Sequence, residues 1–105
     1  MALHLPHDER QWRRAAHGAL LALGRRAADG GMLESDLVAV LHEELRIGRA
    51  IITDALDHLV RRELLRREQV RGLVADGSFY SLTPAGVTVL AGGPDELLSF
   101  RVAHE

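Results

Sequence analysis

The sequence predicts a mainly α-helical domain that carries one small β-hairpin. Apolar residues recur at helical spacing in three successive segments of the first 63 residues. A strong hairpin-turn signal, Asp76-Gly77, then lies between two β-rich runs, and Thr83-Pro84 provides the start of a fourth helix. The expected order is therefore three helices, a hairpin and a helix.

The composition is that of one ordinary globular domain. The chain has 105 residues, of which 47% are hydrophobic and 27% are charged, and it contains no cysteine. A chain of this length builds one core, and the missing cysteine excludes disulfides and thiolate metal sites. We expect a cytoplasmic protein, because the sequence shows neither a signal-peptide pattern nor an apolar run of bilayer length.

The first helix is expected over Glu9 to Ala28. Asp8 and Gln11 have the spacing of a capping box, and Gly30 with Gly31 can take the left-handed conformation that ends a helix. Met32 and Leu33 are too few for more than a short strand. The apolar positions at helical spacing are Trp12, Ala16, Ala19, Leu20, Leu23 and Ala27.

Two further helices are expected on either side of a break at Arg46, Ile47 and Gly48. Ser35 is the predicted N-cap of the first, and the second should end near Glu63. The inward-facing residues of the first are Leu37, Val40, Leu41 and Leu45. Those of the second are Ile52, Ala55, Leu56, Leu59 and Val60.

A hairpin should follow, with one strand within Leu64 to Val74 and the other over Phe79 to Leu82. With Asp76 and Gly77 as the two turn residues, the cross-strand pairs would be Val74 with Phe79 and Leu73 with Tyr80.

The last helix should begin at Thr83-Pro84 and end at Gly92-Gly93. Its expected apolar face consists of Val87, Leu90 and Ala91. We predict three regions along the chain: a flexible N-terminus over 1–7, the folded domain over 8–93, and a tail over 94–105 that is either a last helix or a dimer contact.

Two helices joined by a tight break and followed by a hairpin have the order of a winged helix-turn-helix, whose second motif helix can enter the major groove. The run from Ala55 to Arg67 resembles the recognition-helix end and first wing strand of the MarR and PadR groups of bacterial regulators. The run from Phe79 to Gly86, followed by Leu90, resembles their second wing strand and next helix start. Glu63 stands where those groups usually have glycine. The resemblance covers roughly residues 10 to 92 and implies a dimer that binds promoter DNA.

The same resemblance implies which residues contact double-stranded DNA. The start of helix three would meet base edges, and arginines of the wing would meet phosphates. The expected helix residues are Arg46, Arg49, Ala50, Thr53 and Asp54, and the expected wing residues are Arg66, Arg67 and Arg71.

The charge pattern both supports and opposes this interpretation. Residues 46–71 carry seven arginines against four carboxylates, a net charge of +3, whereas residues 31–45 carry −4 and residues 72–105 carry −3. Carboxylates near the expected DNA face oppose a polyanion. They are Glu43, Glu44, Asp54, Asp57 and Asp76.

The leading hypothesis is therefore a non-enzymatic regulator that binds DNA as a homodimer, with helix one and the tail after Pro94 as the dimer contact. Trp12 is then a core or dimer-contact residue. The alternative is a winged-helix module or complex subunit that binds protein and not DNA, which Ile51 favours because an apolar residue lies near the exposed side of helix three.

Metal, cofactor and enzyme functions are not favoured. His4 and His7 flank a proline and have no ligand partner fixed by spacing, and His42 and His58 are expected at or near the surface. The serines lie in no nucleophile-elbow pattern, the glycine pairs are better explained as helix ends, and no pair of carboxylates is placed for acid-base chemistry.

Overall fold

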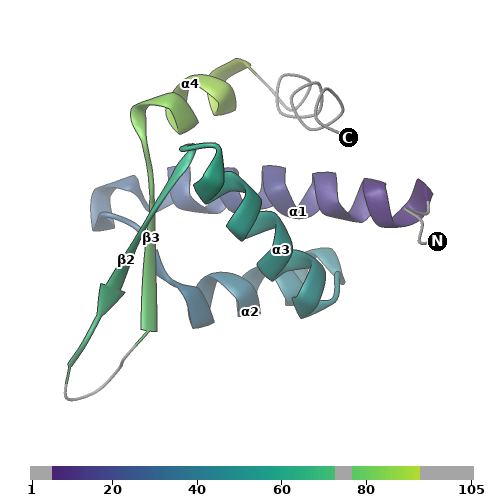
Figure 1. The fold of residues 1–105 in the computed structure, drawn as a ribbon, viewed down its shortest axis with the longest axis horizontal. Coiled ribbons are helices and arrows are strands. Elements are labelled where there is room, and N and C mark those ends of the chain that lie inside the picture. The colour runs from purple at the N-terminus through teal and green to yellow at the C-terminus, as the bar shows by residue number, and fades with distance from the viewer. Residues whose placement is uncertain (1–5, 73–76, 93–105) are drawn as a thin grey trace.

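The computed structural model describes residues 6–72 and 77–92 of the protein. Four helices and three short strands, with one turn of 3-10 helix, follow one another in the predicted order (Figure 1). The elements are α1 (Pro6–Arg25), η1 (Ala27–Asp29), β1 (Met32–Leu33), α2 (Glu34–Leu45), α3 (Arg49–Arg61), β2 (Leu65–Val70), β3 (Gly77–Leu82) and α4 (Pro84–Gly92). The predicted fold class, mainly α with a small hairpin, is confirmed.

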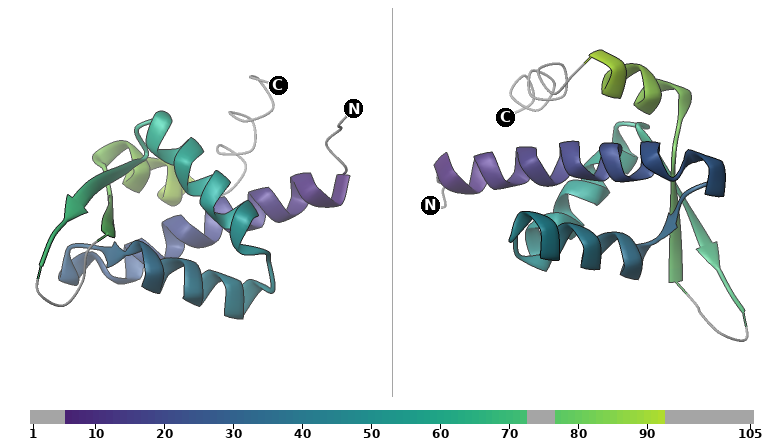
Figure 2. Two further views of the ribbon diagram at one scale, coloured as in Figure 1. Left: turned by 60° about the horizontal axis from the view of Figure 1, so that its bottom comes forward. Right: turned by 180° about the vertical axis from the view of Figure 1, so that it is seen from behind.

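Helix α1 is the centre of the fold. It packs against α2, α3 and α4, and the two further views in Figure 2 show α4 on one side of it and α2 on the other. The hairpin of β2 and β3 extends away from this helical body. The largest fully buried side chains come from every helix except α4 and from both hairpin strands, so they form one core. They are Leu20, Leu23, Leu37, Ile47, Ile52, Leu56, Leu59, Leu65 and Tyr80.

Helix α1 lies three residues further toward the N-terminus than predicted at both ends. It begins at Pro6, so Asp8 is inside the helix and is not its N-cap. Proline suits a first helical position because its missing N–H would have no helical partner there. After Arg25 the chain tightens into η1, and Gly30 ends that turn in the left-handed conformation, donating its N–H to the Ala27 carbonyl at 3.1 Å.

Helix α2 begins at Glu34 without a side-chain cap, and the prediction of Ser35 as its N-cap is wrong. Its N-cap residue is Leu33, which has an extended backbone because it is also the last residue of β1 and pairs with Phe79. Strand pairing therefore fixes where the helix starts. Glu34 and Asp36 in the first turn place negative charge at the positive end of the helix dipole.

The break between α2 and α3 is confirmed. Arg46 takes a left-handed conformation with φ 60° and donates its N–H to the His42 carbonyl at 3.0 Å. His42 also supports the turn through its side chain, because its Nδ1 lies 2.8 Å from the Ile47 carbonyl oxygen. Ile47 is fully buried, and Gly48 then serves as the N-cap residue of α3.

The sheet has the strand order β1-β3-β2, and both pairings are antiparallel. The predicted two-residue turn is wrong: Val70 pairs with Gly77, and six residues connect the strands. The partners of Phe79 and Tyr80 in β2 are Glu68 and Arg67, not Val74 and Leu73. Residues 73–76, which include Asp76 of the predicted turn and the expected pairing residues Leu73 and Val74, lie outside the described residues.

The register is set at the core end of the hairpin. Leu65 is buried and pairs with Leu82, and the Thr83 N–H donates to the Leu64 carbonyl at 3.2 Å. Pro84 has no N–H and cannot extend the ladder, so β2 must pair with residues that precede it. This constraint, not the glycine turn, determines which side chains meet.

The start of α4 is confirmed in detail. The Thr83 hydroxyl accepts a hydrogen bond from the Gly86 N–H at 3.0 Å and donates one to the Glu63 carbonyl at 2.7 Å. The predicted apolar face is partly wrong, because Val87 is 53% exposed and Ala91 is also exposed.

A close backbone contact explains the rotation of α4. A Cβ on Gly86 would lie 2.2 Å from the Leu64 carbonyl oxygen, so only glycine permits this approach. Residues three and four positions further on, Val89 and Leu90, share the face of Gly86 and pack on the core. The expected second glycine of the helix end, Gly93, and the tail over 94–105 lie outside the described residues.

Candidate nucleic-acid interface

Helix α3 is amphipathic, with its apolar face in the core. Ile52, Ala55, Leu56 and Leu59 are fully buried. The opposite face, at helical spacing, presents one arginine, one alanine and two carboxylates to solvent or to the hairpin. These residues are Ala50, Asp54, Asp57 and Arg61.

The start of α3 holds the cationic part of the predicted site. Arg46 and Arg49 are both exposed, three residues apart at the break that leads into the helix. Within residues 6–72 and 77–92 neither arginine forms an ion pair. Both guanidinium groups are therefore available to an anion that approaches the start of α3.

An open groove of about 380 Å³ lies between the start of α3 and the hairpin. It lies between the first turns of α2 and α3 and the β3 end of the hairpin, so Arg49 and Thr53 face β3 across it. Its lining residues are Leu33, Glu34, Ser35, Val38, Arg49, Thr53, Gly77 and Ser78. Of the predicted DNA contacts, Arg49 and Thr53 line this groove beside the hairpin. Glu34 also lines it and adds a carboxylate that was not expected there from the sequence.

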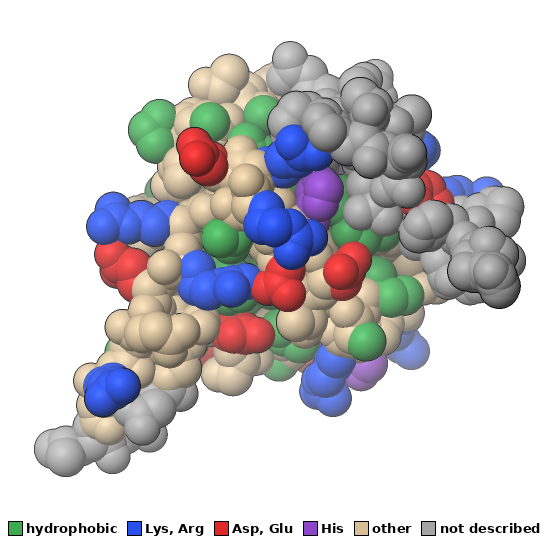
Figure 3. Space-filling model, viewed as in Figure 1, with side chains coloured by type: hydrophobic (Ala, Val, Ile, Leu, Met, Phe, Trp, Pro, Cys, Tyr) green, Lys and Arg blue, Asp and Glu red, His purple; other side chains and the backbone are tan. Residues whose placement is uncertain are grey.

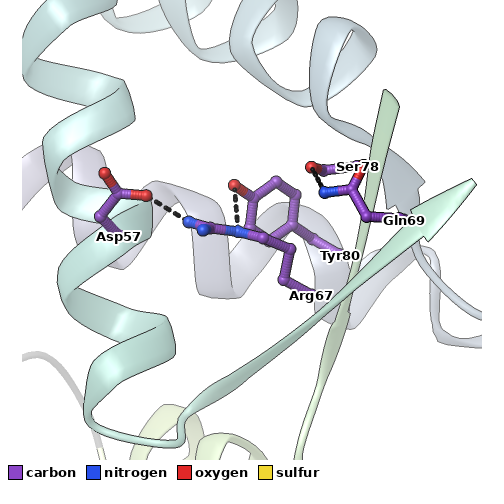
Figure 4. Close-up of polar contacts among 5 residues, drawn as sticks. All are labelled: Asp57, Arg67, Gln69, Ser78 and Tyr80. Atoms are coloured by element: carbon purple, nitrogen blue, oxygen red, sulfur yellow. Dashed lines mark hydrogen bonds and ion pairs between the residues drawn. The ribbon is translucent and has the colours of Figure 1, made fainter. Parts of the chain in front are cut away.

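The hairpin arginines have different surroundings. Arg66 pairs with Glu68 at 2.8 Å, and both side chains are more than half exposed. Arg71 is exposed and follows directly after β2. Arg67, which alternates with Arg66 and so points to the other face of the strand, turns toward α3 and pairs with Asp57 (Figure 4).

Tyr80 completes this contact. It is 1% exposed, and its hydroxyl accepts a hydrogen bond from Arg67 Nε at 3.1 Å. Burial raises the pKa of the Tyr80 phenol, an effect that Glu34 adds to and Arg67 partly opposes. Burial lowers the pKa of Arg67, but the hydrogen bond to Asp57 and the interactions with Tyr80 outweigh it and raise that pKa overall.

Sequence reasoning missed the contact between Asp57 and Arg67. Asp57 and Arg61 are four residues apart in α3, a spacing that suits an ion pair within the helix, whereas the structure pairs Asp57 with Arg67 of β2. Only the register of the hairpin reveals this pair, because the register puts Arg67 opposite Tyr80 and beside α3.

Acidic and basic side chains alternate on the face that Figure 3 shows, over α3 and the base of the hairpin. Two of the predicted arginines, Arg66 and Arg67, lie beside carboxylates that offset their charge. Of the predicted arginines, Arg46, Arg49 and Arg71 are therefore the exposed ones without a carboxylate partner among the described residues, while the exposed Asp54 lies on the same helix as Arg49.

Two alternatives lose the observations that favoured them. Ile51 is half-buried and packs against the core, so it is not an exposed apolar anchor for a protein partner. Trp12 is 3% exposed, which makes it a core residue and not an exposed dimer contact. Its ring packs edge-to-face against the His58 ring, with the two centroids 5.1 Å apart. Among the described residues no cluster of histidine, aspartate and glutamate could hold a metal ion. His4 lies outside them.

No family model matches the sequence, and no curated protein matches it. Solved structures do. A PadR-like transcription factor from Bacteroides fragilis has a TM-score of 0.60 and 22% identity, over 85% of this chain and 86% of that one. The SSV1 protein F-93 has a TM-score of 0.57 and 19% identity, over 87% and 91%. ZitR of Lactococcus lactis has a TM-score of 0.53 and 25% identity, over 85% of this chain and 57% of ZitR.

The first of these is a PadR-like transcription factor, and the arrangement that this chain shares with them is that of winged-helix proteins. The protein has the winged helix-turn-helix fold. Helices α2 and α3 are its helix-turn-helix, and β2 with β3 is its wing. None of the described helices is long and apolar enough to cross a membrane.

Proposed function

We propose that this winged-helix protein is a cytoplasmic transcriptional regulator that binds double-stranded DNA as a homodimer and acts by binding, not by catalysis. The observation that carries the proposal is the position of Arg46 and Arg49 at the start of α3, exposed and without an ion pair among the described residues, next to the groove that leads to the wing. In this fold the second helix of the motif is the element that enters the major groove.

In the proposed complex the first turns of α3 read base edges. An arginine can donate two hydrogen bonds to guanine, and threonine or alanine can contact the methyl group of thymine. Arg46 and Arg49 therefore take either a guanine or a phosphate, while Ala50 and Thr53 take thymine methyl groups. Asp54 accepts from a cytosine amino group, which gives this carboxylate a role that favours one base.

The wing meets the phosphate backbone beside the groove. Arg71 is exposed beyond the end of β2, and Arg66 lies earlier on the same strand. The Arg66–Glu68 pair is no obstacle, because exposed ion pairs contribute only about 0–1 kcal/mol and exchange partners readily. With so few uncompensated arginines, we expect a modest salt dependence.

The proposed dimer contact uses α1 and the tail after Pro94, together with the outer face of α4. Helix α4 carries no charged residue, and Val87 is the exposed large hydrophobic side chain among the described residues. An uncharged helix with an exposed apolar residue is suited to a contact with a second copy of the chain.

A salt-resolved fluorescence anisotropy titration on mixed-sequence duplex DNA tests the proposal. The Arg46→Ala/Arg49→Ala variant should bind more weakly, with a shallower dependence of log affinity on log salt by about 0.9 for each phosphate that is no longer neutralised. The matched control is Arg10→Ala/Arg25→Ala, which removes two exposed arginines of α1 outside the motif and should keep most of the affinity as long as it keeps the wild-type dimer.

Sedimentation of all the proteins at the titration concentrations controls for altered dimerisation. Wild-type protein that does not bind duplex DNA even at low salt would overturn the proposal and leave a winged helix that binds protein. Equally weakened binding in the two double variants, with both still dimeric in sedimentation, would show that the start of α3 is not the DNA contact.

A further inference from the structure

One guanidinium group joins the wing to α3. Arg67 and Tyr80 are cross-strand partners of β2 and β3, and the Arg67 guanidinium carbon lies 5.3 Å from the centre of the Tyr80 ring. Arg67 Nε donates to the Tyr80 hydroxyl, and Nη2 of the same group donates to the Asp57 carboxylate (Figure 4). Tyr80 is almost fully buried, so the guanidinium is held between a fixed core residue and the side of α3.

The charges of this contact count against Arg67 as a phosphate ligand. Asp57 lies on the stripe of α3 that also carries Ala50 and Asp54, so in the proposed complex it is near DNA. If Arg67 left Asp57 for a phosphate, it would expose a carboxylate beside the polyanion. The attraction gained would be offset by the repulsion created. Arg71, in contrast, has no carboxylate partner among the described residues.

We propose that Arg67 is a positioning residue: it fixes the angle of the wing against α3 and neutralises Asp57, and it makes no phosphate contact itself. This inference rests on the proposed function for its effect on DNA binding. Its effect on the wing does not depend on DNA, because the contact exists in the unbound protein.

The first measurement uses hydrogen exchange in the protein without DNA. Arg67→Met keeps most of the aliphatic stem but removes the donors, and Asp57→Asn removes the charge of the acceptor. Each variant should speed exchange of the wing amides beyond Arg67, over 68–70 and 77–79, on the order of ten-fold. The double variant should be no faster than the single ones, because the same ion pair is absent from all three. Arg71→Met is the matched control and should leave these amides unchanged.

The second measurement is the salt dependence of DNA affinity. The Arg67→Met/Asp57→Asn double variant removes the ion pair without changing the net charge, so it should weaken binding at every salt concentration with an unchanged slope, whereas Arg71→Met should make the slope shallower by about 0.9. Arg67→Lys keeps the charge but cannot bridge both partners in the same geometry. It should also weaken binding, and it takes the place of Arg67→Met if that variant does not fold.

Unchanged wing exchange in the Arg67 variants, or a shallower slope for the Arg67→Met/Asp57→Asn variant, overturns the positioning role. Full affinity in Arg67→Lys also overturns it, because a simple phosphate contact tolerates lysine. If the wild-type protein binds no DNA, the proposed function fails, and the exchange measurement alone still decides whether Arg67 positions the wing.

Discussion

Glu63 offers a direct test of how the chain turns from α3 into the wing. It has φ 63°, a left-handed backbone conformation, and stands just after the end of α3. Its N–H donates to the Val60 carbonyl at 2.9 Å and its own carbonyl accepts from Thr83, so the turn is held on both sides. A side chain with a Cβ is strained there, and glycine is not.

We therefore expect Glu63→Gly to stabilise the protein. The left-handed conformation costs a residue with a Cβ about 1–2 kcal/mol. About 0.4–1 kcal/mol of this gain is offset, because glycine makes the unfolded chain more flexible. The net increase in the free energy of unfolding is then about 0.5–1 kcal/mol, which for a domain of this size raises Tm by about 2–5 °C.

The control is Glu63→Ala, because Glu63 also places negative charge at the negative end of the α3 dipole. Alanine removes the same carboxylate but keeps the Cβ, so the difference between the two variants isolates the backbone conformation. Thermal and urea unfolding, followed by circular dichroism, give both values. Equal stability of the glycine and alanine variants, or a lower Tm for glycine, would refute the reasoning that this position is strained.

Three further outcomes follow from the same structure. Arg46→Gly should also raise Tm by a few degrees in thermal unfolding, because Arg46 has φ 60°. The same variant should weaken DNA binding as much as Arg46→Ala does, which fluorescence anisotropy would show. Gly86→Ala should destabilise the protein by about 1–3 kcal/mol in urea unfolding, since its Cβ would meet the Leu64 carbonyl, while Thr88→Ala on the exposed side of α4 should change little. The free energy of unfolding should fall as pH rises above about 10, because the pKa of Tyr80 is raised in the folded protein and the unfolded chain ionises first; a pH series of urea titrations should show a smaller fall for Tyr80→Phe.

Helices could be predicted from the sequence where the local signals and the burial of apolar residues in the core favour the same structure. Four of the five inward positions expected for α3 are fully buried, and the fifth, Val60, packs against the core. The break before α3 and the threonine cap of α4 were also predictable, because each depends on residues within one or two turns of the chain.

The errors lie where a distant contact overrides a local signal. Ser35 is a good cap by propensity, but Leu33, the last residue of β1 and the partner of Phe79, takes the N-cap position, so the helix begins at Glu34 and Ser35 lies within its first turn. In α4 the expected apolar stripe is rotated, because Gly86 must face the Leu64 carbonyl. Neither contact can be derived from the residues near the element that it moves.

The wing register links the fold to the site. In the predicted register Tyr80 would face Leu73, and the charges of Arg67 and Asp57 would have no reason to meet. The observed pairing of Leu65 with Leu82 places Arg67 opposite Tyr80 and within reach of α3. The sequence supplies the arginines, but the burial of Leu65 and the proline after β3 decide which of them can face an anion. In the proposed function, Arg71 and the two arginines at the start of α3 are the ones available to DNA, because Arg67 is already paired with Asp57.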